Sequence, residues 1–199
     1  MDGEGVTTLV AFMLCPLACR YCLNPQTLSV SYPFKEYSAA ELYDEIRKDE
    51  LYFLATGGGV TFGGGEPLLN HQFIKEFRDV CGEQWKINVE TSLNVPSSFL
   101  ETIIPVTDGY LIDIKDMDPA IYSAYTGRDN SLVLSNLRIL AEQGLADKCV
   151  VRIPLIPGFN TQEDVARSEA EVRSLGFGRI DKFEYNIDYA TRKRNLQNA

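Results

Sequence analysis

The sequence has few of the residues that most often carry acid–base or metal chemistry, with one histidine, one tryptophan and five cysteines among 199 residues. Around the single histidine, His71, no Ser–His or Cys–His catalytic pair can be built, and its place at an expected helix start favours solvent exposure. The sequence therefore gives no support to a nucleophile that is activated by histidine.

Long hydrophobic runs and an excess of positive charge are also missing. No apolar stretch approaches the roughly 20 residues that a membrane helix needs, and TTLVAFML follows acidic residues instead of the basic region of a secretion signal. With 19 basic and 28 acidic residues, a net charge of −9 disfavours binding to nucleic acid or anionic lipid. We expect a monomeric cytoplasmic protein with neither nucleic-acid nor membrane partners.

Short apolar runs alternate with amphipathic, helix-like segments along the whole chain. The runs are rich in Val, Ile, Leu and Phe, as expected of strands that are covered on both faces. We expect six strands, at Thr7–Leu14, Val60–Phe62, Lys86–Thr91, Gly109–Lys115, Cys149–Ile156 and Lys182–Ile187.

Helix start signals stand between these strands. Ser38 and Glu41 have the spacing of a capping box, and Asp118 precedes a proline at a first helical position. The other four expected helices open at Asn70, Pro96, Ser131 and Thr161, and Gly144 and Gly176 follow two of them. Alternation of six strands and six helices predicts one α/β domain over residues 1–199, with a parallel sheet in either an open doubly wound form or a partial (β/α)6 barrel.

Polar residues gather where the predicted strands end. They are GGGE at 63–66, ETS at 90–92, DIK at 113–115, Arg152 and Asn186. In a barrel-like array the carboxyl ends of the strands meet at one edge, where active sites are built. Any one of these groups alone could merely cap a helix, but five at one edge indicate a site.

Three of the five cysteines lie within eight residues, in CPLACRYC at 15–22. Cys15, Cys19 and Cys22 can each bind one iron of a [4Fe–4S] cube, whose fourth iron then stays open to a non-protein ligand. Zinc is the alternative, but it usually takes four protein ligands in paired spacings, and no further cysteine or histidine has such a spacing. Cys81 and Cys149 are expected to be buried small hydrophobic residues.

This cysteine spacing, with Tyr21 before the last cysteine, resembles the signature of the radical S-adenosylmethionine enzymes. In that family the open iron is chelated by the amino and carboxylate groups of S-adenosyl-L-methionine. One electron from the reduced cube then cleaves the sulfonium to methionine and a 5′-deoxyadenosyl radical. The resemblance implies a [4Fe–4S] cluster and S-adenosyl-L-methionine as cofactors, and the partial-barrel core fold of that family.

Two glycine triplets flank the second predicted strand in TGGGVTFGGGEPLL, at 56–69. Neither G-x-G-x-x-G nor G-x-x-x-x-G-K-[ST] fits this stretch, so both phosphate-binding interpretations fail. GGGEP is similar to the GGE motif of radical S-adenosylmethionine enzymes, which binds the methionyl amino group through backbone and acidic oxygens. A carboxylate at Glu66 suits an ammonium group.

Further blocks resemble the glycyl-radical-enzyme activating enzymes, most closely the pyruvate formate-lyase activating type. They are DGEGV at 2–6, VETS at 89–92, LIDIKDMD at 111–118, YTGRDN at 125–130 and VRIPLIPGFN at 151–160. The resemblance implies cofactor contacts from Tyr21, Gly64, Gly65, Glu66, Ser92, Asp113, Lys115, Arg152 and Asn186. It also implies a monovalent cation held by Glu90, Thr91, the Leu111 backbone and Asp113.

The chain departs from that family at several positions. Leu23 stands where the activating enzymes have histidine, Glu90 where they have aspartate, and Tyr185–Asn186 where they have a Tyr–His pair. No inserted eight-iron segment is present, which excludes the longer activating classes.

Three functions follow from these patterns. The first is abstraction of a hydrogen atom from a glycine of a partner glycyl radical enzyme, with flavodoxin or ferredoxin as electron donor. The second is the same radical chemistry on a small molecule or another peptide, and the third is a non-catalytic zinc or iron–sulfur module. The basic segment TRKRN at 191–195 is expected to be a solvated terminus, with docking of an acidic electron donor as the alternative.

Overall fold

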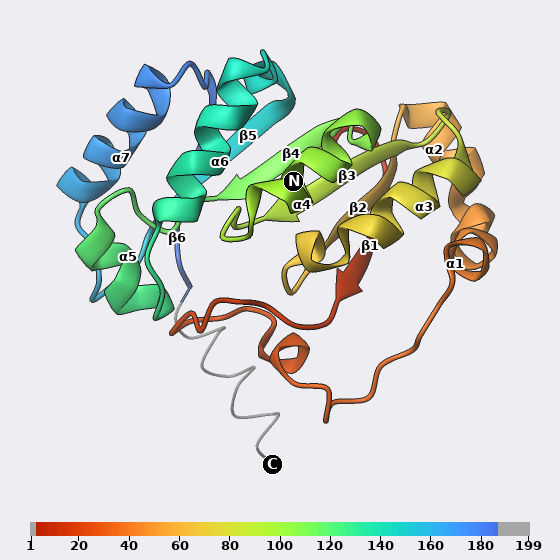
Figure 1. Ribbon diagram of the computed structural model, residues 1–199, viewed down its shortest axis with the longest axis horizontal. Helices are drawn as coiled ribbons and strands as arrows, with labels where there is room; N and C mark the ends of the chain where they lie inside the picture. Colours follow the sequence, from red (N-terminus) through yellow and green to blue (C-terminus); the bar gives the residue numbers. More distant parts are fainter. Residues whose placement is uncertain (1–2, 187–199) are drawn as a thin grey trace.

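A computed structural model describes residues 3–186 of the chain, and the basic segment at 191–195 lies outside them. Six parallel strands form one sheet in the order β1-β2-β3-β4-β5-β6 (Figure 1). They are β1 (Thr7–Phe12), β2 (Gly59–Gly64), β3 (Lys86–Thr91), β4 (Gly109–Asp113), β5 (Cys149–Leu155) and β6 (Arg179–Glu184).

Strand order distinguishes between the two predicted architectures. A doubly wound sheet reverses its strand order at a switch point, whereas here every strand lies beside its neighbours in sequence. No pairing joins β1 to β6 within residues 3–186, so the sheet is not closed. The predicted α/β fold with a parallel sheet, in the form of a partial (β/α)6 barrel, is confirmed.

Helices connect the strands, and Figure 1 shows them covering one face of the sheet. They are α1 (Ala39–Ile46), α2 (Glu50–Thr56), α3 (His71–Cys81), α4 (Ser97–Ile103), α5 (Pro119–Thr126), α6 (Ser131–Glu142) and α7 (Gln162–Ser174). The first predicted helix is divided, because a 3-10 turn at Arg47–Asp49 separates α1 from α2. The predicted capping box at Ser38 is confirmed, and the expected helix start at Thr161 forms a second capping box, with Asp164.

Only β3 has the predicted bounds, and β2, β4 and β5 differ from the prediction by one or two residues at an end. The last strand begins at Arg179, three positions before the expected Lys182, and the predicted end at Ile187 lies outside the described residues. The first residues of β6 are mostly charged and exposed, so no apolar run in the sequence marks the start of this strand. The first strand ends at Phe12, because Leu14 adopts a positive φ of 71° that extended backbone does not allow.

Alternate strand residues face opposite environments. Phe62, Val89 and Ile112 are completely buried in the core beneath the helices, whereas Leu9 on β1 is 51% exposed. Because the barrel is incomplete, its inner face stays open to solvent along part of its length.

The isolated cysteines and the histidine are placed partly as expected. Cys149 is buried, as predicted, but Cys81 is only half-buried. The expected exposure of His71 is wrong, because its ring is half-buried and stacks on Phe99 with ring centroids 4.1 Å apart. Within residues 3–186 no helix is long and apolar enough to cross a membrane.

Candidate active site

A cavity lies where the carboxyl ends of the strands meet the loop that follows β1. All three clustered cysteines line it, together with side chains from the ends of β2, β3 and β4. Its lining residues are Cys15, Leu17, Cys19, Cys22, Leu23, Asn24, Gly64, Gly65, Glu66, Glu90, Thr91, Ser92, Asp113, Lys115 and Tyr185. Most of the residues predicted from the sequence are thus brought to one place.

Backbone hydrogen bonds join the start of the cysteine loop to the end of β2. The Gly65 N–H donates to the Phe12 carbonyl at 2.9 Å, and the Glu66 N–H donates to the Leu14 carbonyl at 2.8 Å. Leu14 is the residue before Cys15, and its left-handed backbone is costly for a leucine. This turn therefore redirects the chain so that Cys15 faces the cavity instead of continuing the strand.

The middle of the cysteine loop is held by the end of α5. The Ala18 N–H donates to the Thr126 carbonyl at 2.9 Å, and the Arg20 N–H donates to the Tyr125 carbonyl at 3.1 Å. The Arg128 guanidinium reaches back to the Pro16 carbonyl at 3.0 Å. The YTGRDN block is thus the support on which the cysteine loop rests, a role that the sequence did not reveal.

The thiols fit ligation of a cluster better than disulfide chemistry. All three are unpaired. Burial raises the pKa of Cys15 to about 12 and that of Cys19 to about 11, although the Lys115 ammonium lowers the latter in part. Without a metal both thiols are therefore protonated at neutral pH, and a bound metal would have to displace the protons.

The three thiols need not converge on a single point to hold a cluster. Among residues 3–186, no group of three or more His, Cys, Asp or Glu side chains is placed to hold one metal ion. In a [4Fe–4S] cube each cysteine binds a different iron. Three free cysteines around one cavity fit that arrangement.

The glycines at the end of β2 are required by close backbone contacts. A Cβ on Gly65 would lie 2.1 Å from the Leu14 carbonyl oxygen, and one on Gly64 would lie 2.7 Å from the Ala11 Cβ. Gly64 also has a φ of 88°, which favours glycine. Only glycine lets the cysteine loop pass this close to β2.

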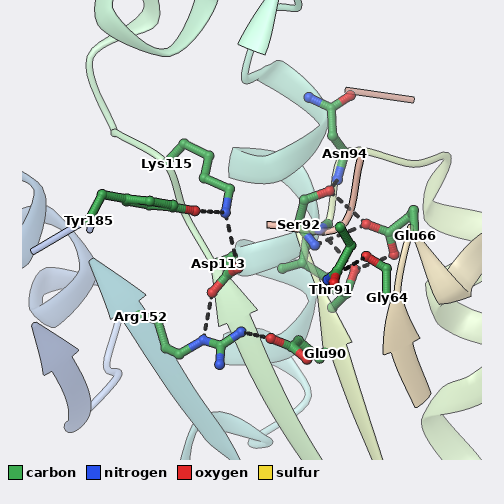
Figure 2. Close-up of polar contacts among 12 residues, drawn as sticks. Gly64, Glu66, Glu90, Thr91, Ser92, Asn94, Asp113, Lys115, Arg152 and Tyr185 are labelled. Carbon is green, nitrogen blue, oxygen red and sulfur yellow. Dashed lines mark hydrogen bonds and ion pairs between the residues drawn. The ribbon is translucent and has the colours of Figure 1, made fainter. Parts of the chain in front are cut away.

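Glu66 is buried, and its carboxylate is fully hydrogen-bonded within the protein (Figure 2). One oxygen accepts from the Thr91 hydroxyl at 2.6 Å and the Leu68 N–H at 3.3 Å. The other accepts from the N–H and hydroxyl of Ser92, at 2.9 and 2.6 Å. Burial raises the pKa of Glu66 in spite of these donors. The acid therefore ties β2 to β3.

A chain of charged groups crosses the ends of β4 and β5. The Lys115 ammonium lies 3.0 Å from an Asp113 carboxylate oxygen and donates to the Tyr185 hydroxyl at 3.1 Å. Burial alone would lower the pKa of Lys115, but Asp113 and Tyr185 raise it well above its ordinary value. Burial would likewise raise the pKa of Asp113, but Lys115 and Arg152 hold it below its ordinary range. Both groups are charged at neutral pH.

Arg152 lies behind this pair and reaches two carboxylates. Its Nε lies 2.6 Å from the second Asp113 oxygen, and its Nη2 contacts Glu90. Figure 2 shows the guanidinium between the two acids. Burial opposes the charge of Arg152, but the two carboxylates raise its pKa above the ordinary value.

Four predicted residues do not line the cavity. Tyr21 packs in an aromatic cluster, with its ring centroid 5.7 Å from that of Phe159 and 6.1 Å from that of Tyr125. Arg152 reaches the cavity only through the acids it contacts, Leu111 is buried in the middle of β4, and Asn186 is exposed just after β6.

The cavity also contains residues that were not among the expected cofactor contacts. Tyr185 is 7% exposed and partners Lys115, and Asn24 donates to the Gly64 carbonyl at 3.3 Å. Only the position of Tyr185 beside Asn186 gave a sequence signal. Asn24 comes two residues after the last cysteine, in a segment without periodicity.

Comparison with known proteins gives a consistent picture. Residues 10–168 match the family described as the Radical SAM superfamily. The (2S)-3-sulfopropanediol dehydratase activating enzyme of Klebsiella oxytoca is 41% identical over 128 residues, covering 63% of this chain and 39% of that protein. The pyruvate formate-lyase-activating enzyme of Clostridium pasteurianum is 30% identical over 210 residues, covering 96% of this chain and 85% of that protein.

A solved structure supports the same relationship. A domain of the pyruvate-formate lyase-activating enzyme from Bacteroides vulgatus superposes with a TM-score of 0.53 at 30% identity, covering 71% of this chain and 92% of that domain. The chain spans less than half of the Klebsiella relative and most of the Clostridium relative. By its sequence match, fold and cysteine-lined cavity, the chain belongs to the radical SAM superfamily and, within it, to the family of the pyruvate formate-lyase-activating enzymes.

Proposed function

We propose that the chain activates a glycyl radical enzyme by removing a hydrogen atom from a glycine of that partner. Cys15, Cys19 and Cys22 would hold a [4Fe–4S] cluster at the cavity, with S-adenosyl-L-methionine on its open iron. When bound, the reduced cluster would supply one electron to the sulfonium, whose C5′–S bond would break to give methionine and a 5′-deoxyadenosyl radical able to take the glycine hydrogen. An external one-electron donor, flavodoxin or ferredoxin, would restore the reduced cluster.

The observation that carries the proposal is the convergence of three free cysteines and a buried ammonium on one cavity. A zinc module would need a fourth protein ligand, which no described residue supplies there. Lys115 is buried and paired with Asp113, so its ammonium is held in the wall of the cavity, where it could meet a polar or charged group of a ligand.

The residues of the chain would position the cofactor. The backbone carbonyls at Gly64 and Gly65 would accept from the methionyl amino group, because both oxygens of Glu66 already accept hydrogen bonds within the protein. Lys115 and Tyr185 offer polar atoms opposite the cysteine loop. Leu17 and Leu23 line the same cavity and would restrict access of water to a radical.

The open barrel suits a macromolecular substrate. The inner face is not closed between β1 and β6 within residues 3–186, and Leu9 is half-exposed on it. A glycine on a loop of a folded partner needs such an opening to reach the cofactor. A small molecule would not need it.

The test is electron paramagnetic resonance on a mixture of the reconstituted chain, S-adenosyl-L-methionine, a reductant and a glycyl radical enzyme encoded beside it. A glycyl radical signal should form, and should be absent when the acceptor glycine of the partner is replaced by alanine. Cofactor cleavage without a radical on any such partner would favour a small-molecule or other peptide substrate instead.

A further inference from the structure

Glu90, Asp113 and Arg152 lie on one face of three adjacent strands. Asp113 is directly opposite Arg152 in the β4–β5 register. Glu90 is opposite Leu111 in the β3–β4 register, two residues before Asp113 and on the same face. The long arginine side chain therefore crosses β4 and reaches the acid of β3.

The guanidinium is the cation that holds the two acids together. Its Nε meets Asp113 at 2.6 Å and its Nη2 meets Glu90, and the arginine side chain is only 13% exposed. Lys115 takes the other Asp113 oxygen at 3.0 Å. The negative charges of Glu90 and Asp113 are therefore balanced by the positive charges of Arg152 and Lys115, without an added ion.

The side chains expected to bind a monovalent cation make other contacts. Thr91 projects to the other side of β3, where its hydroxyl donates to Glu66 and accepts from the Leu93 N–H at 2.9 Å. Both oxygens of Asp113 and one of Glu90 are occupied by basic side chains. A hard cation needs several converging oxygens, and these residues do not provide them.

We propose that the guanidinium of Arg152 bridges Glu90 and Asp113 in place of the monovalent cation that the resemblance to the activating enzymes implies. A planar guanidinium with five N–H donors can bridge two carboxylates as a spherical ion does. Glu90, one methylene longer than the aspartate of those enzymes, gives the reach for this bridge. The contribution of the Arg152 bridge to cofactor binding rests on the proposed function, but the absence of a monovalent-cation site does not.

The first test uses thallium-205 NMR on the cluster-free chain, with Tl⁺ as a substitute for K⁺. The wild-type chain should show no saturable, K⁺-displaceable Tl⁺ binding, whereas Arg152→Gln should acquire it, because the two acids lose their internal cation. Lys75→Gln, which removes an exposed cation on α3, is the matched control and should behave as wild type. Saturable binding to the wild-type chain overturns the proposal, whether or not any variant folds.

The second test measures cofactor affinity by anaerobic calorimetry in KCl and in choline chloride at equal ionic strength. The wild-type affinity should be the same in both salts. Arg152→Gln should bind about tenfold more weakly in choline and recover in part in KCl. Arg152→Lys, which keeps the charge, should stay insensitive to K⁺. A wild-type affinity that falls about tenfold without K⁺, or an Arg152→Gln chain that folds but gains no K⁺ response, contradicts the proposal.

Failure of the proposed function would look different. A chain that binds no S-adenosyl-L-methionine in either salt would refute the cofactor assignment, while the Tl⁺ result would still decide whether Arg152 replaces an ion.

Discussion

Ser92 donates two hydrogen bonds to the carboxylate of Glu66, from its backbone N–H at 2.9 Å and from its hydroxyl at 2.6 Å. This contact joins the glycine-rich end of β2 to the end of β3 in the wall of the cavity. An acid that resembles a ligand for the cofactor ammonium is thus a buried structural link. Loss of this link should mainly lower the stability of the fold, and cofactor binding should be affected only as a consequence.

Replacing Glu66 with glutamine should lower the free energy of unfolding by about 1–3 kcal/mol. Each carboxylate oxygen accepts from a backbone N–H, of Leu68 or of Ser92. The glutamine NH₂ must therefore face one of these donors, whichever way the amide is turned. Urea denaturation of the cluster-free chain measures the change, with the exposed Glu76→Gln as control. Equal midpoints for both variants would show that the link is weak.

Replacing Lys115 with methionine should weaken S-adenosyl-L-methionine binding by about tenfold and leave the iron content unchanged. The ammonium lines the cavity but is no ligand to iron, and methionine keeps much of the side-chain volume. Anaerobic calorimetry and iron analysis on the same sample separate the two effects. Loss of iron with unaltered cofactor affinity would place Lys115 in cluster assembly instead.

Asp108 should give the chain a pH-dependent part of its stability, far from the cavity. Burial opposes its charge, but the Ile87 N–H at 2.9 Å and the Arg78 guanidinium at 2.5 Å hold its pKa below the ordinary value. Because the pKa is lowered on folding, this stability is present above the unfolded value of about 3.9 and is lost as the pH falls through the lower folded value.

The Asp108→Asn variant should therefore be less stable than wild type by about 1 kcal/mol at pH 7, with the difference vanishing in acid. Thermal melts from pH 7 down to pH 3 measure it. A difference that stays constant over that range would mean that hydrogen bonding, and not charge, accounts for the effect.

The sequence predicted the sheet and most of the cavity because their signals are local. Buried strands are short apolar runs, and the cysteine spacing is contained in eight residues. What it missed depends on distant contacts. Support of the cysteine loop by Thr126 and Arg128 joins segments over 100 residues apart in the chain, and no local pattern marks such a pair.

Side-chain direction was the other limit. Thr91 and Glu90 are neighbours in sequence, yet the pleat sends them to opposite faces of β3, so only one can meet Asp113. A motif carried over by residue identity cannot show that Glu66 is satisfied internally or that Arg152 already bridges two acids. Those outcomes depend on which donors lie within reach in the folded chain.

Anaerobic reconstitution with iron and sulfide decides whether Cys15, Cys19 and Cys22 hold a reactive cluster. The wild-type chain, reduced with dithionite in the presence of S-adenosyl-L-methionine, should show the signal of a reduced [4Fe–4S] cluster and release 5′-deoxyadenosine and methionine. Alanine at any one of the three cysteines should abolish both, whereas Cys81→Ala and Cys149→Ala should keep both, because neither lines the cavity. Full cluster retention in Cys19→Ala, or no 5′-deoxyadenosine from a fully loaded wild-type chain, would contradict the assignment.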